Sequence, residues 1–205
     1  MRLFALRHGE TAWTRERRFS GSRDLPLTTQ GERQAQALAD ALTAERVSAV
    51  YTSPLDRTRT TAEIVARALK LPVTIEPGLR EMAFGDWEGL TRDEVAERWP
   101  DLFDLWRTSP ERAVPAGGEG VLEVAGRAGK ALQQIRDLHP EGTVVVVSHA
   151  IVLRLIVLDA LGLGPDRLWS LDASPSGLTE IEYQPDWATV HRMNTLAHLG
   201  AEPGP

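Results

Sequence analysis

The chain has 205 residues and a formal net charge of −6, with 29 acidic side chains against 23 lysines and arginines. Its length and its 42% hydrophobic residues are sufficient for one substantial buried core. The acidic balance argues against a nucleic acid as partner, and the absence of cysteine excludes disulfides and thiolate metal sites.

The first part of the chain alternates predicted strands and helices. LFAL and VSAVYTS are typical of strands, and between them LTTQGERQAQALADAL has helical periodicity, with Thr29 and Glu32 at capping-box spacing. Ser53 and Pro54 predict an N-cap and first helical residue for a second helix through LDRTRTTAEIVARAL. A short strand is expected at residues 73–75.

The next part begins with GLREMAFGDWEGL, a loop rich in glycine and aromatic residues. Thr91 and Glu94 again have capping-box spacing and predict the first of two short helices that end near residue 107. After PAGGEG we expect a long helix over residues 121–138 and then TVVVVS, a continuous apolar run typical of a central strand. A helix over residues 150–161 and the strands LTEIEYQ and ATVHRMN follow.

The segment TVVVVSHAIVLRLIVLDALGLG has nearly the length of a membrane span. His149, Arg154 and Asp159 interrupt it, which favours a buried strand followed by a helix. The amino terminus also lacks the long apolar core of a signal peptide. We therefore expect a cytoplasmic protein without a membrane partner.

Strands that alternate with helices predict an α/β fold with three layers, a mostly parallel central sheet and helices on both faces. We expect one domain over residues 1–205, with a cap-like insert at about 79–118 and a disordered tail at 200–205. An edge strand or the cap could form a homodimer contact.

Several polar residues follow predicted strands, where α/β sheets bind ligands. Arg7 and His8 follow the first strand, Arg57 lies in the first helical turn after the second, and His149 follows TVVVVS. We expect these four to meet at one edge of the sheet, with Glu81 of the glycine-rich loop closing over them.

Two arginines, two histidines and a carboxylate suit phosphoryl transfer from a phosphate monoester. Arginine forks match phosphoryl oxygens, a histidine can form a covalent intermediate, and a carboxylic acid can protonate the leaving alcohol. Each residue taken singly also has a structural interpretation. His149 could be a buried structural histidine, Arg57 could lie on the surface, and Glu81 could form an ion pair with Arg80. A metal site of His8, His149 and carboxylates is a further alternative, although no HxH or HExxH spacing supports it.

Two other groups of residues have both a structural and a functional interpretation. The stretch TRERRFSGSRD is either a solvated loop or a basic rim that captures a small anionic substrate. Its arginines are Arg15, Arg17, Arg18 and Arg23. Large aromatic residues either line a pocket or fill the core and the cap. They are Trp13, Phe84, Trp87, Trp99 and Trp106.

Together these segments resemble the histidine phosphatase superfamily, the phosphoglycerate-mutase-like proteins. The resemblance begins with LRHGET and continues through RFSGSRDLPLTTQGERQAQALA, SPLDRTRTTA, LREMAFGDWEGLT, PAGGEG and VVVVSHAIVLR. It extends to about residue 155 in the family's order and spacing. It implies that His8 is phosphorylated on a ring nitrogen during turnover and that Glu81 is the general acid.

The resemblance also implies a set of contacts to the substrate. Arg7, Arg57 and His149 would hold the phosphoryl oxygens, and Ser20 and Gly21 match a substrate-contacting loop. Neither a metal nor a nucleotide cofactor is expected.

At two positions the chain departs from the family's pattern. Thr14 stands where the family usually has an asparagine, so that a hydroxyl with shorter reach would meet the phosphoryl group. Ala150 stands where a glycine usually follows the second histidine, which is a cost if that backbone needs a positive φ. Both substitutions concern the rate and the shape of the pocket.

The resemblance leaves the reaction to be decided among three alternatives. Met82 and Phe84 stand where cofactor-dependent phosphoglycerate mutases have a cation and a hydroxyl, although Arg92 preserves one charge. FGDWEGLT resembles the phosphatase branch, so we expect a metal-independent phosphatase of a small phosphorylated metabolite. A mutase is the first alternative. A non-catalytic phosphate-binding module is the second, which the presence of all five central residues disfavours.

Overall fold

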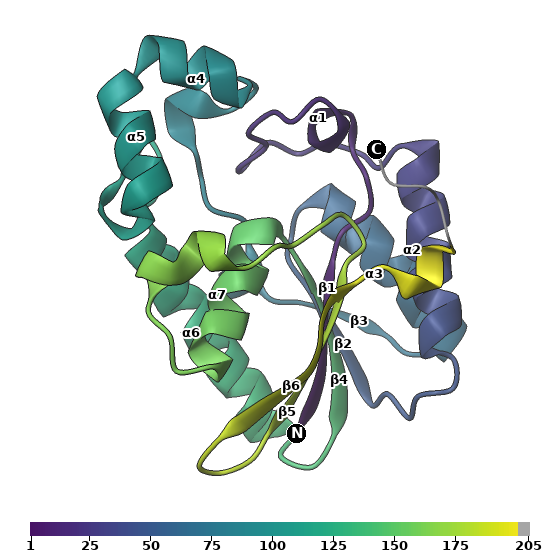
Figure 1. Ribbon diagram of the computed structural model, residues 1–205. Coiled ribbons are helices and arrows are strands. Elements are labelled where there is room, and N and C mark those ends of the chain that lie inside the picture. The colour runs from purple at the N-terminus through teal and green to yellow at the C-terminus, as the bar shows by residue number, and fades with distance from the viewer. Residues whose placement is uncertain (201–205) are drawn as a thin grey trace.

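The computed structural model describes residues 1–200, which form a central sheet between two layers of helices (Figure 1). Six strands pair in the order β3-β2-β4-β1-β5-β6. The strands are β1 (Arg2–Arg7), β2 (Ala49–Thr52), β3 (Val73–Ile75), β4 (Thr143–Ser148), β5 (Leu178–Tyr183) and β6 (Ala188–Thr195). Of these strands β5 alone runs against the others, so the predicted, mostly parallel α/β sheet is confirmed.

Seven α-helices connect the strands of the described chain. They are α1 (Ala12–Arg15), α2 (Thr29–Leu42), α3 (Asp56–Leu69), α4 (Arg92–Arg98), α5 (Pro100–Thr108), α6 (Val121–Leu138) and α7 (Ala150–Ala160). Helices α2 and α3 cover one face of the sheet, and α6 and α7 cover the other (Figure 1). Helix α1 lies in a segment that the sequence predicted as a loop.

The alternation of side chains along β4 explains why its apolar run has no polar face. Val145 and Val147 pack with α2 and α3, whereas Val144 and Val146 pack in the core cluster of α6 and α7. All four are fully buried. A strand covered on both faces needs apolar residues at every position, as the sequence predicted.

Two helix starts differ from their predictions. Helix α2 is capped by Thr28, whose hydroxyl accepts from Gly31 N, so the predicted cap at Thr29 is wrong by one residue. Helix α3 begins at Asp56 without a side-chain cap, so the predicted cap at Ser53 is also wrong. The hydroxyl of Ser53 instead lies against a histidine of the site described below. The capping box of Thr91 before α4 is confirmed.

The segment predicted as a cap, residues 79–118, contains α4 and α5, which lie beyond the carboxyl ends of the strands (Figure 1). Phe84, Trp87 and Trp106 of this segment are buried, and Phe84 and Trp87 each pack edge to face with Trp106. Their burial confirms a packing role for Phe84 and Trp87, whereas Trp106 packs in the core and also lines a cavity described below. The predicted disorder of the tail lies outside the described residues from position 201 onward.

No helix within residues 1–200 combines the length and the apolar character that a membrane span requires.

Candidate active site

His8 is the first residue after β1, and its backbone is fixed from two sides. Its N–H donates to Ser148 O and its carbonyl accepts from Ser176 N, both at 3.1 Å. The buried imidazole places Nδ1 2.7 Å from Gly9 O. Because a carbonyl oxygen can only accept, Nδ1 carries the proton and Nε2 keeps its lone pair. In this tautomer Nε2 has a free lone pair and can act as a nucleophile.

The glycine after His8 is required by a close approach of two backbones. A Cβ atom at Gly9 would lie 2.3 Å from Gly31 O, at the start of α2. The Gly9 N–H donates to Thr61 Oγ1 of α3 at 3.2 Å. The loop that carries His8 is thereby packed directly against both helices of this face.

Arg7, the last residue of β1, supplies a half-buried cation beside His8. Its Nη1 donates to Ala173 O at 2.5 Å, and its buried Nε has no hydrogen-bond partner among the described residues. Burial lowers the pKa of Arg7 to about 10, so the guanidinium stays charged at neutral pH. A phosphoryl oxygen would give the unpartnered Nε–H an acceptor.

Arg57 is fully buried in the first turn of α3. Its Nε donates to His149 Nδ1 at 3.2 Å, Nη1 to Arg23 O at 2.6 Å and Nη2 to Gly21 O at 2.8 Å. A guanidinium has five N–H donors, so two remain for a ligand. Burial lowers the pKa of Arg57, and the charge of Glu81 opposes this shift.

His149 follows β4 and has a defined tautomer. Because Arg57 can only donate, Nδ1 of His149 accepts, and the Nε2–H donates to Ser53 Oγ at 2.7 Å. The rings of His149 and His8 are edge to face, with centroids 5.2 Å apart. Burial and the nearby charge of Arg57 hold the pKa of both histidines well below the usual range, so both are neutral.

Glu81 is the buried carboxyl group of the site. Its Oε1 accepts from Met82 N at 3.0 Å, and Ile151 N in the first turn of α7 lies 3.5 Å from Oε2. Burial raises the pKa of Glu81, although the charges of Arg57 and Arg7 oppose this. Burial therefore favours a neutral His8 imidazole and a protonated Glu81 carboxyl group beside two guanidinium charges, and this arrangement complements a dianionic phosphoryl group.

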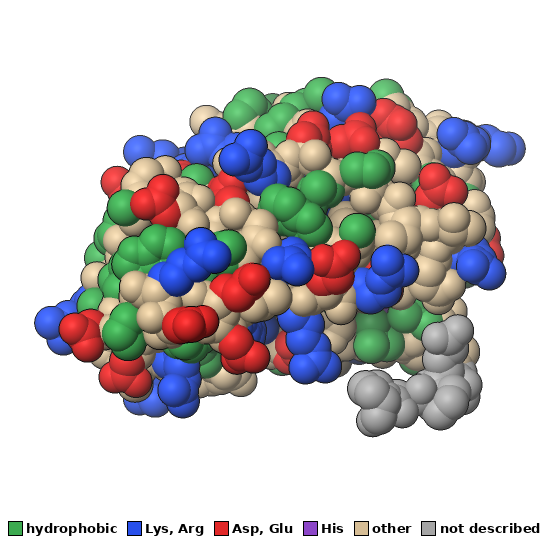
Figure 2. All heavy atoms as spheres, turned by 90° about the horizontal axis from the view of Figure 1, so that it is seen from above, with side chains coloured by type: hydrophobic (Ala, Val, Ile, Leu, Met, Phe, Trp, Pro, Cys, Tyr) green, Lys and Arg blue, Asp and Glu red, His purple; other side chains and the backbone are tan. Residues whose placement is uncertain are grey.

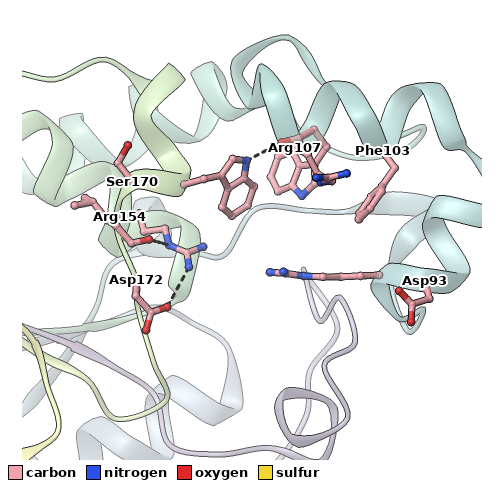
Figure 3. A pocket seen from close by; sticks show the side chains of 10 residues that line it. Asp93, Phe103, Arg107, Arg154, Ser170 and Asp172 are labelled. Atoms are coloured by element: carbon pink, nitrogen blue, oxygen red, sulfur yellow. Dashed lines mark hydrogen bonds and ion pairs between the residues drawn. The ribbon is translucent and has the colours of Figure 1, made fainter.

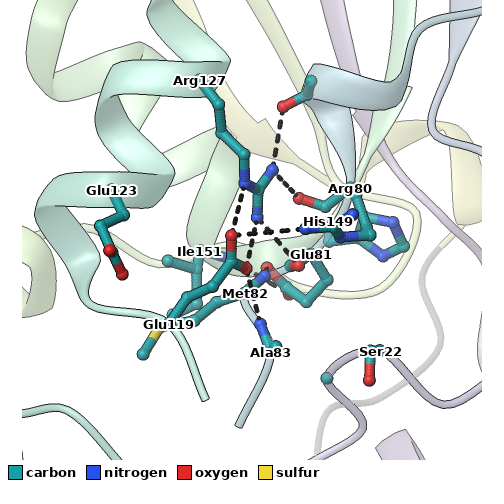
Figure 4. A network of polar contacts seen from close by, with 12 residues as sticks. Ser22, Arg80, Glu81, Met82, Ala83, Glu119, Glu123, Arg127, His149 and Ile151 are labelled. Carbon is teal, nitrogen blue, oxygen red and sulfur yellow. Dashed lines mark hydrogen bonds and ion pairs between the residues drawn. The ribbon is translucent and has the colours of Figure 1, made fainter. Parts of the chain in front are cut away.

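The backbone around Glu81 is held by an ion pair that the sequence analysis missed (Figure 4). Arg127 of α6 binds both carboxylate oxygens of Glu119 at 2.9 Å. The same guanidinium donates to Glu81 O at 3.0 Å and to the carbonyl oxygens of Gly78 and Arg80. Glu119 also accepts from Ala83 N, so the pair holds the loop on both sides of Glu81.

The structure brings Arg7, His8, Arg57, Glu81 and His149 together at the carboxyl edge of the sheet. Ser53 joins them as the partner of His149, although the sequence indicated a helix cap for it. The signal that could have located Ser53 is its place directly after β2. Arg127 and Glu119 have no sequence signal beyond their charge, because their role depends on how α6 packs.

The predicted substrate-contacting residues outside the central five have different surroundings. The Thr14 hydroxyl is engaged with the backbone of Thr11 in the cap of α1. Ser20 is half-buried, and Gly21 has a φ of +51° with its carbonyl on Arg57. Ala150 is the first residue of α7 and has no positive φ, so the expected backbone cost of alanine is absent.

The basic stretch after α1 is only partly an open rim. Arg18 is half-buried and ties this segment to the cap through Glu94 Oε2 at 3.2 Å and Gly89 O at 2.9 Å. Arg15, Arg17 and Arg23 are exposed. Viewed from above in Figure 2, lysine and arginine side chains alternate with acidic ones, so this face has no uniform charge.

Within residues 1–200, no three histidine, aspartate or glutamate side chains are grouped as a metal site requires.

Comparison with known proteins identifies relatives along almost the whole chain. Residues 3–196 match the model of the histidine phosphatase superfamily, branch 1. Phosphoserine phosphatase 1 of Hydrogenobacter thermophilus is 32% identical, with 98% of this chain and 95% of that protein covered. A probable phosphoglycerate mutase, GpmB of Cronobacter sakazakii, is 35% identical, with coverage of 98% and 96%.

Solved structures give the same result. Bacillus stearothermophilus YhfR superimposes with a TM-score of 0.91 at 36% identity, covering 97% of this chain and 98% of that one. The α-ribazole phosphatase of Shigella flexneri superimposes with a TM-score of 0.86 at 30% identity, covering 95% and 96%. The relatives therefore include proteins named as phosphatases and proteins named as probable phosphoglycerate mutases.

Proposed function

The chain belongs to the histidine phosphatase superfamily, branch 1, and on this premise we propose that it hydrolyses a small phosphorylated metabolite through a phosphohistidine at His8. Glu81 is the general acid, and the reaction needs no metal. The observation that carries the proposal is the meeting of the His8 imidazole and the Glu81 carboxyl group with the guanidinium groups of Arg7 and Arg57 at one edge of the sheet. Burial also lowers the pKa of His8, which favours a neutral nucleophile, and raises that of Glu81, which favours the protonated acid.

The reaction takes two displacements at phosphorus. In the first, Nε2 of His8 bonds to phosphorus, the ester P–O bond breaks, and the leaving alkoxide takes the proton of Glu81. In the second, water attacks the phosphohistidine and gives a proton to the Glu81 carboxylate, the P–N bond breaks, and phosphate leaves. Arg7 and Arg57 stabilise the charge on the phosphoryl oxygens in both steps.

Two side chains support hydrolysis over the mutase alternative. Met82 and Phe84 occupy the positions where mutases have a cation and a hydroxyl. Both are buried in the core, with 0% and 5% of their surface exposed, so neither can bind a substrate carboxylate. Water rather than a retained alcohol then takes the phosphoryl group from His8.

The test is phosphate release from a panel of phosphomonoesters in EDTA, with wild type and His8→Ala measured together. We expect release that survives EDTA and falls at least about 10⁴-fold in His8→Ala, as for the loss of other catalytic nucleophiles. His191→Ala, on the exposed surface of β6, is the matched control and should match wild type. Acid-labile phosphate on His8 should be trapped during turnover.

Three results would contradict the proposal. Turnover by His8→Ala near the wild-type rate would exclude the phosphohistidine. Full loss in EDTA that zinc or magnesium restores would indicate a metal enzyme. Isomerisation of 3-phosphoglycerate with its bisphosphate primer, without net phosphate release, would identify a mutase.

A further inference from the structure

We infer that the substrate's alcohol carries a ring and a second anionic group, and that both bind in a cavity between the cap and α7, beside the phosphoryl site. The inference rests on the proposed function, because it names the substrate class of the same site. It is carried by the size of the cavity, its arginines, its aromatic wall and its connection to Arg7.

The cavity is much larger than a phosphoryl group requires. Its volume is about 810 Å³, and its walls come from α4, α5, α7 and residues 169–172. Figure 3 shows Arg154 and Asp172 on one side of it and Phe103 and Arg107 on the other. Sites for small organic ligands have volumes of roughly 300–1,000 Å³, so the cavity fits a leaving group with a ring system.

The charged lining of the cavity favours an anion. Arg92, Arg107 and Arg154 face it, against the two acidic side chains Asp93 and Asp172. The side chain of Arg154 is 12% exposed, and its Nε donates to Leu171 O at 2.9 Å while Nη2 lies 3.4 Å from Asp172.

Asp172 is shared with other donors, because it also accepts from Ser174 Oγ at 2.7 Å and Asn194 Nδ2 at 2.9 Å. In the described part of the chain, Arg92 and Arg107 form no ion pair within 4.0 Å. A carboxylate or phosphate on the substrate would therefore meet arginine donors that the protein itself leaves largely available.

The aromatic lining is rigid and suits a ring. Trp169 donates through Nε1 to Trp106 O at 2.7 Å, and the two indoles are edge to face with centroids 4.9 Å apart. The guanidinium carbon of Arg154 lies 5.1 Å from the centre of the Trp169 ring. An arginine fixed on the Trp169 indole, with Trp106 beside that indole and Phe103 across the cavity, places an anion site at the edge of an apolar wall.

A short segment of chain connects the cavity to the phosphoryl site. Arg154 donates to Leu171 O and Arg7 to Ala173 O, two residues further along. Leu171 is extended, and alternate residues of an extended chain lie roughly 6.5–7 Å apart. The charge of Arg154 acts on Arg7, whose pKa it lowers. One small substrate can therefore reach both arginines.

The experiment uses a matched pair of esters, 6-carboxy-2-naphthyl phosphate and its neutral 6-carbamoyl analogue. For each protein we measure the ratio of kcat/KM for the acid to that for the amide. We expect Arg154→Gln to lower this ratio about tenfold, in line with one charge-assisted hydrogen bond, and Arg92→Gln, at an exposed position, to lower it about two- to threefold. Arg98→Gln, an exposed arginine of the same helix outside the cavity, should keep the wild-type ratio.

A binding measurement separates this inference from the proposed function. In His8→Ala, calorimetric titration with the two esters should give a dissociation constant at least about fivefold lower for the acid, and Arg154→Gln in that background should remove the difference. Equal ratios in wild type and Arg154→Gln, or equal affinities in His8→Ala, would overturn the inference. Failure of wild type to hydrolyse either ester would count against the proposed function, and the binding result would still decide the inference.

Discussion

The phosphoryl site and the neighbouring cavity both contain arginines, but they hold them differently. Arg57 is fully buried, with three of its donors fixed by Gly21, Arg23 and His149. Arg92 and Arg107 of the cavity are exposed on α4 and α5. Donors that are fixed before substrate arrives stabilise developing charge without reorganisation, whereas exposed donors adapt to different groups. The chemistry is therefore built into the buried site, and the choice of substrate into the cavity.

The two regions also differ in the segments that build them. Four of the five central side chains lie at the end of β1 or shortly after β1, β2 or β4, and the sheet fixes where these strands end. The cavity depends on α4 and α5 of the cap and on residues 169–172, which lie outside the strands. Changes in the phosphoryl site should lower the turnover of every substrate, and changes in the cavity should alter the preference among substrates.

Four further tests probe this difference between the phosphoryl site and the cavity. Among them, Glu81→Gln should lower kcat the most. We expect alkyl phosphates to lose about 10² to 10⁴ in kcat, because the departing alkoxide needs a proton. Aryl phosphates with good leaving groups should lose far less. Steady-state kinetics on β-glycerophosphate and p-nitrophenyl phosphate measure the difference. Equal losses on both esters would exclude Glu81 as the general acid.

The pH profile provides a second measurement on the same variant. In wild type, kcat for an alkyl phosphate should fall as pH rises through the raised pKa of Glu81, because only the protonated acid donates. On the acid side of the profile, the pKa of His8 lies well below the ordinary histidine value of 6.5. The His8 imidazole therefore stays neutral when the pH falls through 6.5. Glu81→Gln should lack the alkaline fall, and persistence of that fall would assign it to another group.

Arg57→Ala should lower kcat about 10² to 10³-fold on all substrates, as does removal of a fixed donor to developing negative charge. The variant also leaves the buried carbonyl of Gly21 without its donor, which costs about 1–3 kcal/mol of stability. Arg57→Lys keeps the charge without the planar fork and should recover part of kcat. A rise in KM with kcat unchanged would contradict the difference drawn between the two regions. Arg57 would then contribute to substrate binding, as a cavity residue does, and not to the chemical step.

Glu119→Gln should have the smallest effect, about tenfold in kcat for alkyl phosphates with KM unchanged. It weakens the ion pair through which Arg127 holds the backbone of Glu81, so the acid is less well positioned. A smaller loss on aryl phosphates would distinguish positioning of the acid from general destabilisation. Glu97→Gln, an exposed glutamate of α4, is the control. Equal losses on both ester classes would leave Glu119 with a structural role alone.

Local patterns predicted the order of the elements well and two helix starts wrongly. The bounds of α6, residues 121–138, agree with the prediction, because its apolar period is regular and Gly120 precedes it. Thr28 and Thr29 are chemically equal as caps, and only the contact of Thr28 with Glu10 in the loop after β1 distinguishes them. Ser53 fails as a cap because α3 begins only at Asp56, and the Ser53 hydroxyl accepts from Leu55 N at 3.3 Å and from the distant His149 Nε2 at 2.7 Å.

The sequence by itself determined the α/β fold and the place of four central residues, Arg7, His8, Arg57 and His149, at or near strand ends. Apolar periodicity and strand ends are local properties, and parallel strands place their carboxyl ends at one edge. The tertiary structure alone decided the tautomers of His8 and His149, the Arg127–Glu119 pair behind Glu81 and the arginine-lined cavity. These features depend on the packing of distant segments, which sets burial and the direction of each hydrogen bond.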